Sequence, residues 1–136
     1  MKRVTGIGGI FFKCQDQQLS RQWYERHLGI RSDNYGGCFE WQTHEGVKGH
    51  TVWSPFAVDT QYFSPSKAAF MVNYRVDNLV ELLPVLRDEG VEIIGEMEEN
   101  EFCKFAWILD PNGIKLELWE PPQNFSELCS VLQASE

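Results

Sequence analysis

The chain has 136 residues, of which 43% are hydrophobic and 13% aromatic, which suits one domain with a packed core. Twenty acidic and twelve basic residues give a net charge of −8, and without a basic run this composition argues against binding to nucleic acid or to a membrane surface. A small neutral or cationic ligand fits the charge better, although acidity alone also serves solubility.

The first predicted element is a strand over residues 4–13. The segment MKRVTGIGGIFFKC has the charged-then-apolar order of a signal peptide, but its apolar stretch is short, broken by glycine and interrupted by Lys13. No stretch approaches the roughly 18 apolar residues of a membrane span. We therefore expect a soluble, cytoplasmic protein. Its four cysteines form no CxxC pair, which predicts reduced thiols and argues against a zinc ribbon: Cys14, Cys38, Cys103 and Cys129.

Two helices are predicted, over residues 16–30 and 77–91, because both segments carry the same start and stop signals. Each begins with an aspartate suited to an N-cap and closes on a glycine thirteen residues later. These residues are Asp16 and Gly29 in the first segment and Asp77 and Gly90 in the second.

The buried face of each predicted helix follows from apolar residues at helical spacing. Pro84 lies within the second pattern and predicts a kink or a later start of that helix. The apolar positions are Leu19, Trp23 and Leu28 in the first helix and Leu79, Leu82, Leu83 and Leu86 in the second.

Further strands follow each helix, so the chain repeats one unit twice. The strand ends HTVWSP (residues 50–55) and LELWEP (residues 116–121) align Trp53 with Trp119. Between the two units lies a stretch rich in Pro, Asp and Ser without periodicity, which predicts a linker. The strands are expected near residues 30–34 (a weak one), 37–43 and 49–54 in the first unit and near 68–76, 91–97, 102–109 and 114–120 in the second.

These motifs together point to a known family. Asp16 with WYERHLGI, YRVDNL at residues 74–79 and DPNGIKLELWEPP at residues 110–122 resemble the vicinal oxygen chelate superfamily, which includes glyoxalase I, bleomycin-resistance proteins and extradiol dioxygenases. The resemblance implies an α+β fold in which two tandem βαβββ modules form a curled half-barrel around a cavity, and it also implies a homodimer. The expected boundaries are a single domain of residues 1–136, with module one at about 1–56, a linker at about 57–67, module two at about 68–121 and a C-terminal helix at about 123–134.

Strand alternation then predicts which side chains of the last strand face this cavity. Leu116 and Leu118 would pack beneath the helices, so Glu117 and Trp119 would point into the cavity. Glu117 is therefore the candidate catalytic residue.

By the internal repeat, Thr51 and Trp53 face the cavity as well, while Val52 packs toward the helix layer. The sequence leaves open which face of KFAWILD, residues 104–110, is turned to the cavity. The candidate ligand-binding residues are Thr51, Trp53, Asn73, Phe105, Trp107 and Trp119.

Metal-using members of the superfamily bind their ion with His and Glu at four cavity positions, which fall here on Gly9, on Phe70 or Met71, on Thr51 and on Glu117. Only Glu117 is a strong N or O donor. The resemblance therefore predicts no metal of the family type and no other cofactor, while leaving a different divalent-ion site open. The three histidines are expected to be ordinary surface or packed residues: His27, His44 and His50.

Two functions remain open from the sequence. The first is metal-free binding of a small organic molecule, cationic or aromatic, in an aromatic cavity closed by Glu117. The second is a glyoxalase-like lyase or isomerase that uses Glu117 as a general base. The missing metal ligands argue against a lactoylglutathione lyase or an extradiol dioxygenase. Binding is preferred, because without a metal nothing obvious stabilises an enediolate.

Overall fold

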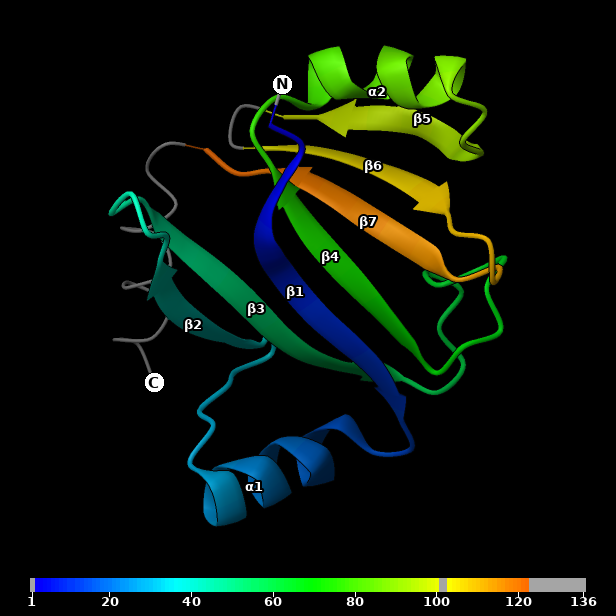
Figure 1. The fold of residues 1–136 in the computed structure, drawn as a ribbon. Coiled ribbons are helices and arrows are strands. Elements are labelled where there is room, and N and C mark those ends of the chain that lie inside the picture. Colours follow the sequence, from blue (N-terminus) through cyan, green and yellow to red (C-terminus); the bar gives the residue numbers. More distant parts are fainter. Residues whose placement is uncertain (1, 101–102, 123–136) are drawn as a thin grey trace.

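The computed structural model describes residues 2–100 and 103–122. It shows a mixed α+β fold with one curled, open seven-stranded sheet and two helices (Figure 1). This matches the α+β fold class that the family resemblance implies. The helix expected near residues 123–134 lies outside the described residues.

The elements follow the repeated order, with one difference in the first half. The weak strand predicted near residues 30–34 is absent, and only an isolated bridge joins Asp33 and Gly36 there. The first half contains β1 (Val4–Cys14), α1 (Gln17–Leu28), β2 (Gly37–Gln42) and β3 (Lys48–Ala57), and the second contains β4 (Phe70–Val76), α2 (Leu79–Asp88), β5 (Ile93–Glu99), β6 (Lys104–Leu109) and β7 (Lys115–Glu120).

The two halves join edge to edge through β1 and β4, which pair antiparallel at the centre of the sheet. The strand order is β2-β3-β1-β4-β7-β6-β5. β3 lies parallel to β1, and β7 lies parallel to β4, so the two halves have matching arrangements. Figure 1 shows α1 and α2 at opposite ends of the curled sheet. This topology makes β1, β4 and β7 neighbours.

Local signals set the helix boundaries much as the sequence predicts. Asp16 caps α1 by accepting a hydrogen bond from a backbone N–H of the first turn at 3.0 Å. Asn78 rather than Asp77 caps α2 in the same way, at 3.1 Å. Because α2 already begins at Leu79, Pro84 lies inside the helix and does not delay its start.

The main core lies between α2 and the second half of the sheet. The four predicted leucines of α2 are all buried, and they pack against Val76, Ala106 and Leu118. Burying such a set removes several large apolar side chains from water, each contributing about 1.5–3 kcal/mol. The predicted inner face of α2 is therefore confirmed: Leu79, Leu82, Leu83 and Leu86.

The prediction for α1 is wrong. No residue of α1 is buried, and Leu19, Trp23 and Leu28 are all more than half exposed. The helix contacts the sheet instead through Tyr24, whose ring centroid lies 4.8 Å from that of Trp53 on β3. Period-3.6 spacing identified an apolar stripe, but the sheet covers a different side of the helix.

Cys14 and Cys103 are free thiols, as expected, whereas Cys38 is disulfide-bonded, so the expectation of reduced cysteines is wrong for Cys38. Within the described residues, neither helix is long and apolar enough to cross a membrane.

Candidate functional site

Glu117 lies in the middle of β7 and is only 3% exposed. Its neighbour Leu118 packs into the core beneath α2. Because side chains of a strand alternate between faces, Glu117 points to the opposite, inner face of the curled sheet. A carboxylate is buried at this depth only when other groups satisfy its oxygens.

Three neutral donors from three segments satisfy Glu117. The Asn73 amide on β4 donates from Nδ2 to Oε1 at 2.6 Å. The Trp107 indole on β6 donates from Nε1 to Oε2 at 2.9 Å, and the Tyr62 hydroxyl, from the β3–β4 linker, donates to the same oxygen. We call these four residues the Glu117 network. It ties the linker to the sheet at the inner face.

Lys115 holds the linker in place beside this network. Its Nζ donates a hydrogen bond to the backbone carbonyl of Tyr62 at 2.6 Å. The same ammonium lies 5.2 Å from the ring centroid of Tyr62 and 5.6 Å from that of Trp107, within cation–π range. Burial and the nearby charge of Glu117 raise the pKa of Tyr62 far above its ordinary value, so its hydroxyl remains a donor.

A cavity of about 260 Å³ opens beside the Glu117 network. Its walls are mostly apolar, and Phe105 stacks in parallel with Trp119, with ring centroids 6.4 Å apart. Such a volume suits a molecule with a single ring. The residues that line it are Gly8, Phe11, Val52, Tyr62, Asn73, Cys103, Phe105, Glu117 and Trp119.

Gly8 on β1 makes this geometry possible. A Cβ atom at Gly8 would lie 2.3 Å from Asn73 Oδ1 and 2.8 Å from Trp119 Cε3, closer than side-chain atoms tolerate. The absence of a side chain thus leaves room for the Asn73 amide and the Trp119 ring.

Thr51 and Trp53 do not line the cavity, which corrects their predicted orientation. The Thr51 hydroxyl donates to the backbone carbonyl of Ile7 and accepts from the Trp41 indole at 2.8 Å. Trp53 packs against Tyr24 of α1. Val52, expected to face the helices, lines the cavity instead. The error lies in the alignment of the two strand ends on their Trp-x-Pro motifs. That alignment differs from the structural correspondence of β3 and β7 by an odd number of residues, so it assigns each side chain of β3 to the wrong face.

The structure brings the other predicted residues together. Asn73, Phe105, Glu117 and Trp119 line the cavity, and Trp107 reaches it through its bond to Glu117. Besides Val52, which was expected on the other face, four further residues line the cavity that sequence reasoning missed. For Tyr62, the only available signal was an aromatic pair inside an otherwise polar linker. The missed residues are Gly8, Phe11, Tyr62 and Cys103, of which the Cys103 thiol has a pKa raised by burial.

A second hollow of about 400 Å³ lies among the N-terminal end of β1, the β2–β3 hairpin and β4. Arg75 contacts the ring of Trp41 there, 5.9 Å from its centroid. Its other charged groups include Lys2 and Glu45, which pair with each other at 3.5 Å while both are exposed. These two opposite charges therefore compensate each other at a solvent-exposed surface of the hollow.

Several solved structures share this architecture. A methylmalonyl-CoA epimerase from Mycobacterium tuberculosis superposes with a TM-score of 0.62 at 18% sequence identity, covering 93% of this chain and 95% of that one. A variant of the Streptomyces coelicolor epimerase in complex with 2-nitronate-propionyl-CoA gives a TM-score of 0.64 at 15% identity, covering 88% and 96%. The chain has the vicinal oxygen chelate fold.

A Legionella pneumophila chain described as an NAD-dependent benzaldehyde dehydrogenase also shares the fold, with a TM-score of 0.54 at 14% identity, covering 83% of this chain and 97% of that one. No family model matches the sequence, and no curated protein matches it. The structural superpositions establish the vicinal oxygen chelate fold. Sequence identities this low leave the activity and the substrate open.

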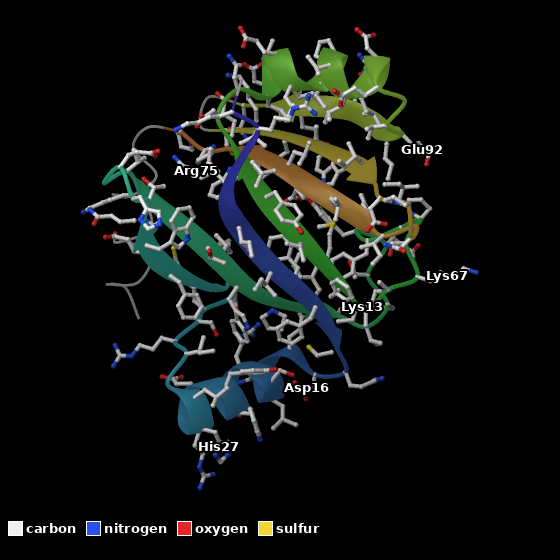
Figure 2. All side chains as sticks on the ribbon, viewed as in Figure 1. Lys13, Asp16, His27, Lys67, Arg75 and Glu92 are labelled. Carbon is white, nitrogen blue, oxygen red and sulfur yellow. The ribbon has the colours of Figure 1, made fainter. Side chains whose placement is uncertain are left out.

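The donors around Glu117 do not fit the divalent ion that metal-using members of this fold bind. A metal needs lone pairs directed at it, whereas Tyr62, Asn73 and Trp107 all direct N–H or O–H groups at the carboxylate, and an indole N–H has no lone pair to give. Met71, at one of the matched positions, is fully buried in an apolar cluster. Among the described residues, no group of three or more His, Cys, Asp or Glu is placed to hold an ion. His27 points away from the sheet on α1 (Figure 2).

Proposed function

We propose that the protein binds a small aromatic organic molecule in the cavity beside Glu117, without a divalent metal. The observation that carries this proposal is the cavity itself, a hollow of about 260 Å³ with aromatic walls and a single buried carboxylate at its edge. Pockets of this composition, apolar with a few convergent polar groups, are the usual form of small-molecule sites.

The walls favour a flat ring over a flexible aliphatic chain. Phe105 lies between Trp107 and Trp119, stacked with both, with interplanar angles of 14° and 8°. A ligand ring that contacts Trp119 extends this stack and buries apolar surface on both sides. Offset stacking adds about 0.5–1.5 kcal/mol to the gain from area burial alone.

Filling the cavity is expected to abolish this binding. Val52→Phe places a ring in the hollow, and we expect the affinity for a one-ring aromatic compound such as toluene or benzyl alcohol to fall at least about tenfold. Isothermal titration calorimetry, run with and without a chelator, measures the change. Val52→Ala, which enlarges the hollow, is the matched control and should retain binding. Equal affinity in the wild type and Val52→Phe would place the ligand elsewhere, and loss of binding on chelation would contradict the metal-free proposal.

An isomerase is the second candidate, because one position on Glu117 Oε1 remains for a substrate and because the epimerases above share the fold. Glu117 would remove a proton from a carbon next to a carbonyl, the electron pair would move to the carbonyl oxygen, and the protonated Glu117 would return the proton to the enolate. Exchange of that hydrogen with deuterium oxide, measured by NMR on an acyl thioester, tests this. Exchange by the wild type but not by Glu117→Gln would favour catalysis over binding.

The homodimer implied by the family resemblance and the cytoplasmic location expected from the sequence remain predictions. The exposed apolar side chains of α1 offer a surface on which a second copy would fit: Leu19, Trp23 and Leu28. Sedimentation equilibrium distinguishes a monomer from a dimer.

A further inference from the structure

One acceptor beside the cavity is unused. Asn73 is 2% exposed, and its Nδ2 donates to Glu117 Oε1, which fixes the orientation of the amide because only its NH₂ end donates. Its Oδ1 is buried and has no hydrogen-bond partner among the described residues. This atom occupies the space that a side chain at Gly8 would fill, at the part of the cavity wall that Gly8 and Asn73 form together. Buried amide oxygens are seldom left unpaired, because desolvation then goes uncompensated.

A second acceptor lies next to it. Glu117 Oε2 already receives two donors, from Tyr62 and Trp107, whereas Oε1 receives one, from Asn73. Each carboxylate oxygen accepts about two hydrogen bonds. The remaining capacity of Glu117 is therefore on Oε1, the oxygen adjacent to the Asn73 amide.

The negative charge of Glu117 is also not balanced by direct contact with a cation. Its three donors are neutral, and none of the ion pairs formed within residues 2–100 and 103–122 includes it. The ammonium of Lys115, two residues before Glu117 on the same strand, is hydrogen-bonded to the Tyr62 carbonyl instead. A cation among aromatic faces gains from both the carboxylate and the rings.

These three observations converge on one ligand chemistry. We infer that the ligand carries a primary ammonium or an amidinium on its aromatic body and donates N–H groups to Asn73 Oδ1 and Glu117 Oε1. This inference rests on the proposed function and specifies its ligand. A hydroxyl offers a single hydrogen and no charge, and a quaternary ammonium offers charge but no hydrogen, so neither satisfies both acceptors.

Four one-ring probes separate the contributions: benzamidinium, benzylammonium, benzyltrimethylammonium and benzyl alcohol. Calorimetric titration of the full chain is expected to give affinities for the first two at least about tenfold higher than for the last two. Equal affinities for benzylammonium and benzyltrimethylammonium would show that the site recognises the positive charge without hydrogen bonds. This result would overturn the inference, while the proposed binding of an aromatic molecule would stand. Failure of all four probes to bind would overturn both proposals.

Glu117→Gln tests the same point from the protein side. The new amide would keep its oxygen toward Tyr62 and Trp107 and donate its NH₂ to Asn73, whose amide would turn, so both free acceptors would be consumed. We expect the preference for benzylammonium over benzyl alcohol to disappear. Glu92→Gln is the matched control, because Glu92 is an exposed carboxylate at the edge of the molecule (Figure 2). A preference that survives in Glu117→Gln, or that Glu92→Gln reduces equally, would refute the inference.

Discussion

Replacing Glu117 with leucine is expected to lower the free energy of unfolding by roughly 3 kcal/mol, because it leaves three donors without their acceptor. Asn73, which is 2% exposed, cannot turn to solvent in the packed sheet, whereas Tyr62, which is 39% exposed, can swing toward water. The leucine recovers part of the loss by burying apolar surface. Urea denaturation followed by tryptophan fluorescence gives the difference.

Glu117→Gln is the comparison that separates hydrogen bonding from packing. Its amide oxygen still accepts from Tyr62 and Trp107, and Asn73 turns to accept from the new NH₂. We expect a loss of only about 1 kcal/mol. Equal stability of the leucine and glutamine variants would show that the Glu117 network does not hold the linker and that Glu117 is merely tolerated at its position.

The orientation of Glu117 followed from its two neighbours alone. Leu116 and Leu118 flank it, and Leu118 has to pack beneath a helix whose four leucines need a partner surface. Alternation then forces the carboxylate to the other face. Where an apolar face is unambiguous, parity is reliable, and this is why the second half of the chain was predicted well.

The first half shows where parity reasoning fails. WSP and WEP look alike, yet Trp53 packs on α1 while Trp119 lines the cavity. Register is set by pairing across the sheet, in which Gly9 opposes Val52 and Asn73 opposes Glu117. A likeness of three residues carries no information on that pairing, and an odd offset moves every side chain to the wrong face.

The contacts of the linker could not be predicted from the sequence for a different reason. Residues 57–67 have neither helical nor strand periodicity, so no rule of spacing assigns an inner face. In the structure Tyr62 reaches Glu117 and Phe63 is fully buried. Contacts of this kind join residues far apart in the sequence. They depend on the path of the linker across the sheet, which the local sequence pattern does not encode.

Phe63→Ala is expected to cost about 3–5 kcal/mol and to release the linker from the site. Phe63 has no exposed surface and packs in a small cluster with Phe11 and Met71, while its ring centroid lies 5.2 Å from that of Phe56. It anchors the segment in which the preceding residue, Tyr62, completes the Glu117 network. Removing the Phe63 ring therefore has two coupled effects: it removes a core contact, and it loosens the part of the cavity wall that Tyr62 forms.

Amide hydrogen exchange distinguishes this coupled effect from a loss of core stability alone. The backbone N–H of Ser66 donates to the Phe63 carbonyl at 2.9 Å, and that of Ser64 donates to Gln61 at 3.1 Å, so both amides report on linker order. In Phe63→Ala they should exchange faster than amides of α2, and affinity for aromatic probes should fall with them. Tyr62→Phe, which keeps the anchor but lacks the hydroxyl, should leave Ser66 protected. If Phe63→Ala speeds exchange equally in α2 and in the linker, Phe63 supports the whole fold, and its assigned role in positioning Tyr62 is wrong.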